Sequence, residues 1–73
     1  MEFLDAALKV LGEERSVLHW TVIQDLALRR GYLDPFTQRD IRKNLLAALS
    51  AGVREGVVVK RGTGLYGLPS DTE

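Results

Sequence analysis

The sequence contains no cysteine, so the fold has no disulfide and no thiolate can bind a metal ion or act as a nucleophile. A single histidine cannot supply the several ligands that a metal site requires. No apolar run approaches the roughly 18 residues of a membrane-spanning helix, and no basic segment marks a secretory signal at the N-terminus. We therefore expect a soluble, cytoplasmic domain that binds no metal or other cofactor and does not interact with membranes.

The chain also lacks net charge, because ten basic side chains balance ten acidic ones. This balance argues against strong nonspecific binding to nucleic acid, but the charges are segregated along the chain. Residues 1–36 carry a net charge of −2, residues 37–61 carry +4, and residues 62–73 carry −2. A basic central segment between acidic ends is the feature that a functional hypothesis has to explain.

A catalytic function has little support in the sequence. The serines do not lie in a nucleophile-elbow sequence, and the glycine-rich GTGLYG at residues 62–67 is not followed by the helix that a phosphate-binding loop requires. A chain of 73 residues is long enough for one small domain. We predict that residues 1–69 form this domain, that residues 70–73 form a disordered tail, and that the protein is not an enzyme.

Hydrophobic periodicity predicts three helices and a terminal hairpin. The first helix begins near Phe3 and is expected to end at Gly12. The second is expected to begin at Thr21, which has the capping-box spacing to Gln24, and to end at Gly31. Between these two helices, residues 17–18 are too few for an independent strand but can pair with the hairpin as a short third strand.

The third helix has the clearest predicted start. Thr37 can cap it, Phe36 has the hydrophobic-staple spacing to Ile41, and Gly52 or Gly56 is expected to end it. Residues 56–68 then predict a hairpin with Lys60 and Arg61 at its tip, because the glycines of RGTG permit a tight turn. The predicted class is α+β, with the winged helix-turn-helix arrangement of three helices and a C-terminal β-hairpin wing.

The segments AALKVL, LHWTVIQDLALRRGYL, IRKNLLAAL and VVVKRGTGLYGL, in this order, resemble the HARE-HTH family of winged-helix domains. Members occur in chromatin-associated proteins, in some restriction systems and at the N-terminus of the bacterial RNA polymerase delta subunit. The resemblance covers residues 3–69, including Leu-His-Trp at the start of the second helix and Tyr-Gly-Leu at the close of the hairpin. It implies a winged-helix fold with a DNA-binding or transcription-linked function.

In a helix-turn-helix protein the third helix reads the major groove of DNA, so its polar outer face is the predicted binding site. The predicted tip of the hairpin would contact the phosphate backbone. Together these hypotheses select eight nucleic-acid-binding candidates: Thr37, Gln38, Arg39, Arg42, Lys43, Asn44, Lys60 and Arg61. The alternatives are a solvated helix face and, at the hairpin, charges that protect an exposed strand edge from pairing with another chain.

His19 and Trp20 lie where the second helix is expected to begin. We predict that His19 caps or packs against this helix and that Trp20 is partly buried, with base stacking as the alternative function of Trp20. The leading functional hypothesis is binding of double-stranded DNA, weakly as a monomer. The alternative is a protein-interaction module that docks on RNA polymerase or on another nucleic-acid enzyme. A homodimer is compatible with both.

Overall fold

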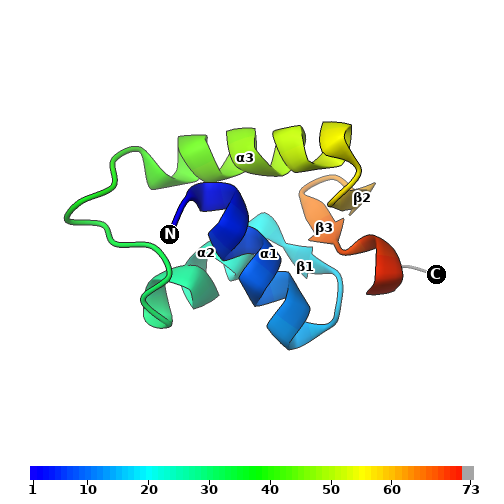
Figure 1. Cartoon of the computed structure of the whole chain (residues 1–73), viewed down its shortest axis with the longest axis horizontal. Coiled ribbons are helices and arrows are strands. Elements are labelled where there is room, and N and C mark those ends of the chain that lie inside the picture. The colour runs from blue at the N-terminus through cyan, green and yellow to red at the C-terminus, as the bar shows by residue number, and fades with distance from the viewer. Residues whose placement is uncertain (72–73) are drawn as a thin grey trace.

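A computed structural model of the chain describes residues 1–71 and contains three helices and a small three-stranded antiparallel sheet (Figure 1). The elements, in chain order, are α1 (Phe3–Glu14), β1 (Leu18–His19), α2 (Trp20–Arg29), α3 (Ile41–Glu55), β2 (Val59–Gly62), β3 (Leu65–Gly67) and the 3-10 helix η1 (Pro69–Asp71). The predicted α+β class is confirmed. The predicted tail begins within η1, and its residues 72–73 lie outside the described residues. None of the helices described is long and apolar enough to cross a membrane.

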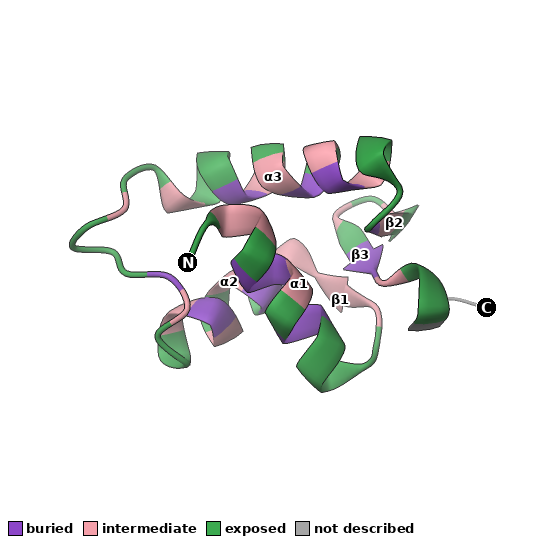
Figure 2. Cartoon of the chain, in the orientation of Figure 1, coloured by how far each residue is buried: buried purple, intermediate pink, exposed green. Residues whose placement is uncertain are grey.

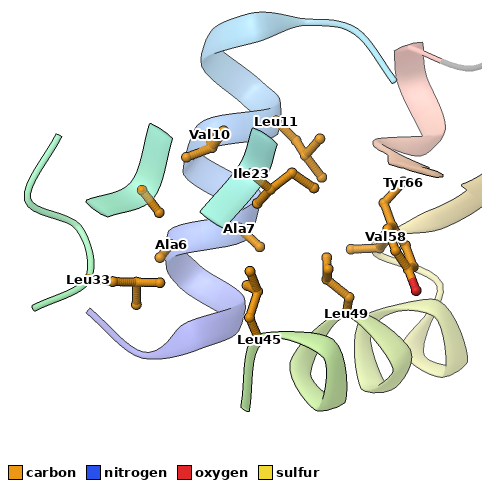
Figure 3. Close-up of a cluster of buried hydrophobic side chains, with 11 residues drawn as sticks. Ala6, Ala7, Val10, Leu11, Ile23, Leu33, Leu45, Leu49, Val58 and Tyr66 are labelled. Atoms are coloured by element: carbon orange, nitrogen blue, oxygen red, sulfur yellow. The ribbon is translucent and has the colours of Figure 1, made fainter. Parts of the chain in front are cut away.

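The core forms where the apolar faces of the three helices meet (Figure 3). Leu45 and Leu49 point from α3 toward α1, which contributes Ala6 and Ala7 to the same cluster. Alanines on α1 leave room for its neighbours to approach closely, so larger side chains can fill the remaining space. Tyr66 of β3 is buried in this cluster, so the hairpin closes the core.

The first two helices differ from the predictions at their ends. α1 continues past Gly12 to Glu14, and Arg15 adopts the left-handed conformation that ends it. α2 begins at Trp20, and its N-cap is His19, whose Nδ1 accepts a hydrogen bond from the backbone N–H of Thr21 (3.3 Å). The predicted capping box of Thr21 and Gln24 is therefore wrong, whereas the predicted capping function of His19 is confirmed.

The predicted start of α3 is also wrong. α3 begins at Ile41, and Asp40 precedes it with a φ of 49° and no side-chain capping bond. Thr37 instead lies in a turn whose backbone N–H groups, at Thr37 and Gln38, both donate to the carbonyl oxygen of Asp34. Because this turn competes successfully with the helix for residues 35–38, Phe36 is 95% exposed and forms no hydrophobic staple.

The sheet has the order β1-β3-β2, so β3 lies between the hairpin's other strand and the short β1. β1 is the predicted third strand, shifted by one residue, and its Leu18 pairs with Tyr66. In the hairpin, residues 63–64 form the turn between the paired Gly62 and Leu65. The prediction that Lys60 and Arg61 form the tip is therefore wrong, because both lie within the edge strand β2.

An exposed polar cluster joins the C-terminal end of α1 to that of α2. The Arg30 guanidinium contacts Glu13 at 2.9 Å and Glu14 at 2.6 Å, and the Tyr32 hydroxyl donates to the Glu13 carboxylate at 2.5 Å. The hydrogen bond from Tyr32 is the largest cause that holds the pKa of Glu13 below its ordinary value of 4.5. The hydrogen bond from Arg30 and the positive charges of Arg30 and Lys9 act in the same direction.

The close approach of α3 to the chain that follows it depends on a glycine. A Cβ atom at the buried Gly52 would lie 2.8 Å from Cγ2 of Val58 and 3.0 Å from Cδ1 of Leu4. Val58 is buried and β-branched, so it cannot rotate away freely. Gly52 therefore lets Val58, just before β2, and Leu4 of α1 pack against the last turns of α3.

Replacing Gly52→Ala should destabilise the protein by about 1–3 kcal/mol through overpacking, although alanine is the better helix former. Gly12→Ala, in α1, is the matched control, because its Cβ would meet only Cδ1 of Leu68, at 3.9 Å. It should stabilise the protein by roughly 0.5–1 kcal/mol. Urea denaturation measures both changes, and equal effects of the two substitutions would contradict the close approach at Gly52.

The polar cluster predicts an acid-dependent loss of stability. Because the pKa of Glu13 is lowered in the folded state, its contribution is complete above pH 4.5 and is lost as the pH falls through the folded value. Tyr32→Phe removes the largest cause of this shift, so its melting temperature should fall less between pH 6 and pH 3 than that of the unmodified protein. In a Glu13→Gln background, Tyr32→Phe should leave this pH dependence unchanged; an equal effect in both backgrounds would contradict the assignment.

Candidate nucleic-acid interface

The cations of the chain fall into two groups that differ in their partners. The first group forms ion pairs with carboxylates. Lys9 of α1 and Arg30, just after α2, both contact Glu13, and Arg29 of α2 contacts Asp25 at 2.9 Å. The basic segment behaves differently, because within residues 1–71 none of its six exposed cations forms an ion pair with a carboxylate. These six, called here the unpaired cations, are Arg39, Arg42, Lys43, Arg54, Lys60 and Arg61. The charge segregation of the sequence is therefore retained at the surface of the fold.

One exposed stripe of α3 carries unpaired cations at both ends. Lys43, Ala47, Ser50 and Arg54 follow the i, i+4, i+7, i+11 spacing of a single helix face, and all four are exposed. Figure 2 shows the buried residues of α3 on the opposite side, toward the other helices. The sequence-based candidates ended at Asn44 and so omitted the last three members of this stripe. The signal was present, because the buried Leu45 and Leu49 fix which face points outward.

The start of α3 is the second basic element. Arg39 precedes the helix, and Arg42 and Lys43 lie in its first turn, where the backbone N–H groups have no partners within the helix. An open hollow of about 600 Å³ lies here, lined by Asp40, Ile41, Arg42, Lys43 and Leu46. The hollow combines two cations and one carboxylate with two aliphatic side chains, so an anionic ligand would meet both attraction and repulsion within it.

Two of the predicted DNA-contact residues form hydrogen bonds to other parts of the chain. The side chain of Gln38 donates to the carbonyl oxygen of Met1 and accepts from the backbone N–H of Asp34, both at 2.8 Å. Asn44 donates to the carbonyl oxygen of Arg39 at 2.8 Å. Thr37, Gln38 and Arg39 all lie before the helix rather than on its outer face. These bonds give Gln38 and Asn44 a structural function that the sequence did not indicate.

Trp20 joins the start of α3 to the hairpin. The guanidinium of Arg42 lies 6.0 Å from the centre of the Trp20 ring, and the backbone N–H of Trp20 donates to the carbonyl oxygen of Gly64 in the hairpin turn at 2.9 Å. Trp20 packs against the core and is half-buried, which confirms its predicted partial burial. Trp20 therefore contacts both the start of α3 and the hairpin turn.

The cations of the hairpin lie on its edge strand. Lys60 pairs with Tyr66, and an irregularity in the register follows between Lys60 and Gly62, so Arg61 is the extra residue of a bulge. β2 contacts α3, and it begins four residues after that helix ends. The structure thus brings the strand that carries these two cations into contact with α3 but, contrary to the prediction, does not place the cations in the turn.

The comparisons with known proteins found no relative of this chain. No family model matches it, and no match was found among the curated proteins or the solved structures. The resemblance to the HARE-HTH family stays a prediction. Within residues 1–71, no group of three histidine or acidic side chains is placed to hold a metal ion.

Substitutions at the neighbouring candidates Gln38 and Arg39 should distinguish a side chain that stabilises the fold from one that is only exposed at the surface. Gln38→Ala removes two hydrogen bonds, one within the α2–α3 connection and one that ties it to the N-terminus, so it should lower the free energy of unfolding by about 1–2 kcal/mol. Arg39→Ala is the matched control and should change it by less than about 0.5 kcal/mol. Urea denaturation of both variants tests this, and a larger loss for Arg39→Ala would contradict the assignment.

Proposed function

We propose that the chain is a DNA-binding winged-helix domain, with α3 in the major groove and the basic hairpin on the adjacent backbone. The order α-β-α-α-β-β and the sheet order β1-β3-β2 support this arrangement. In a winged helix, a short strand after the first helix pairs with the terminal hairpin, and the third helix is left with an exposed face. The resemblance of residues 3–69 to the HARE-HTH family agrees with the same proposal.

The observation that carries the proposal is the placement of the unpaired cations at both ends of α3. Arg39, Arg42 and Lys43 lie at its start, whereas Arg54 lies in its last turn and β2 follows. A helix of 15 residues is about 22 Å long, whereas the major groove is about 12 Å wide. Cations at its ends can therefore reach phosphates on both sides of the groove.

The middle of the same stripe suits the floor of the groove. Ala47 and Ser50 are small, so the helix backbone can approach the base edges closely, and the Ser50 hydroxyl can both donate and accept a hydrogen bond. Phosphate contacts at the ends would fix the position of the helix, and the few polar groups between them would give modest sequence preference. A single small module of this kind binds weakly, and a symmetric dimer would double the contacts.

Salt dependence tests the proposal directly. If about five of the six unpaired cations neutralise phosphates, the logarithm of the binding constant should fall with the logarithm of salt concentration with a slope of about −4 to −5. Fluorescence anisotropy of a labelled duplex, titrated at several salt concentrations, measures this slope.

Single substitutions then locate the interface. Lys43→Ala and Arg54→Ala, at the two ends of the stripe, should each reduce the magnitude of the slope by about 1. Arg29→Ala is the control, because its guanidinium is paired with Asp25 on α2, and it should leave the slope unchanged. Equal effects of all three substitutions, or no binding at low salt, would overturn the proposal. Capture of a protein partner from nuclease-treated extract, without duplex binding, would favour the protein-interaction alternative.

A further inference from the structure

Phe36 lies almost entirely in solvent, and the fold does not use it. Its side chain is 95% exposed, more than any other large hydrophobic residue described. It belongs to the connection between α2 and α3, which extends beyond the helices at one end of the molecule (Figure 1). An exposed aromatic ring contributes nothing to the core and is free to contact a partner outside the domain.

The connection holds Phe36 in a fixed position. The backbone N–H of Phe36 donates to the Asp34 carboxylate at 2.9 Å, and the next two N–H groups donate to the carbonyl oxygen of the same aspartate. Gln38 then ties the turn to the carbonyl oxygen of Met1. A side chain presented from a turn with this many bonds loses little backbone entropy on binding, so it can serve as a preorganised contact.

The charged residues that follow Phe36 in the chain indicate what such a partner would be. Arg39 is three residues away, and Arg42 and Lys43 follow in the first turn of α3, all without an acidic partner among the described residues. The Asp34 carboxylate is turned back into its own loop, which leaves Asp40 as the nearby acid. An exposed aromatic ring in the same segment as several cations is a combination that binds unstacked bases, because the cations can hold the flanking phosphates while the ring stacks on the base.

We propose that Phe36 stacks on an unpaired base of DNA, so that the domain prefers a duplex with a bulged or unpaired base to a fully matched one. This inference rests on the proposed DNA binding and adds to it a substrate class: DNA that is locally distorted or opened beside the segment contacted by α3.

A direct test compares two duplexes of one sequence, one fully matched and one with a single bulged adenine. The unmodified protein should bind the bulged duplex roughly tenfold more tightly, in keeping with stacking of one base on one ring. In NMR spectra of the complex, the Phe36 ring protons should show nuclear Overhauser contacts to the bulged base. Anisotropy at low salt measures both affinities.

Variants at Phe36 separate stacking from other effects. Phe36→Ala and Phe36→Leu should abolish the preference while leaving the affinity for the matched duplex and the melting temperature unchanged, because leucine is apolar but has no flat ring. Phe36→Trp should retain the preference. Val22→Ala changes another exposed apolar residue, on α2, and should leave both affinities unchanged.

The outcomes distinguish this inference from the proposed function. Equal affinities of the unmodified protein for the two duplexes would overturn the stacking of Phe36 and leave DNA binding intact. No binding of either duplex would overturn both. A dimer in sedimentation experiments that Phe36→Ala dissociates would place the ring between two copies of the chain and would also overturn the inference.

Discussion

The pairing of β1 with β3 is the interaction that joins the two halves of this small fold. A two-stranded hairpin is barely stable in water, and β1 adds only the residues Leu18 and His19 to it. These two residues nevertheless connect directly to α2, because His19 caps that helix and Trp20 begins it. The hairpin is therefore attached where α2 starts, and the N–H of Trp20 adds a further bond to the hairpin turn. Through this attachment the position of β2, and of its cations, is set relative to α3.

The net charge of zero hides two surfaces with different properties. At the C-terminal ends of α1 and α2, acids and bases lie close enough to pair, and the pairs link helices that are adjacent in the fold. Along α3 and β2 the cations have no such partners among the described residues. The cations at the first surface already have carboxylate partners, so the unpaired cations are the ones that remain available to an external anion. Composition alone therefore does not show that the cations without a carboxylate partner are concentrated on α3 and β2.

The sequence predicted the number, order and apolar faces of the helices, because burial leaves a regular periodicity that needs no knowledge of tertiary contacts. The errors lie where a few hydrogen bonds decide between alternatives of similar energy. Gly12 offered a helix stop, but α1 gained another turn before Arg15 ended it. Of the two glycines in RGTG, only Gly64 has a positive φ, which places the turn at residues 63–64 and leaves Lys60 and Arg61 in the strand. The contacts of Gln38 with Met1 and of Arg42 with Trp20 join distant segments, and periodicity carries no information about them.

The error at the start of α3 has a physical cause that also bears on function. Thr37 has the chemistry of an N-cap, and Phe36 would have been buried against Ile41 if the helix had begun there. The Asp34 turn instead captures the N–H groups of residues 36–38 with its carboxylate and carbonyl oxygens. The helix starts later, at Ile41, and the aromatic ring is left outside the core. The bonds that prevent a local hydrophobic contact between Phe36 and Ile41 are thus the ones that leave the ring in solvent, where we propose that it stacks on an unpaired base. Departures from local sequence rules tend to occur at functional sites, and here one turn accounts for both the departure and the exposed side chain.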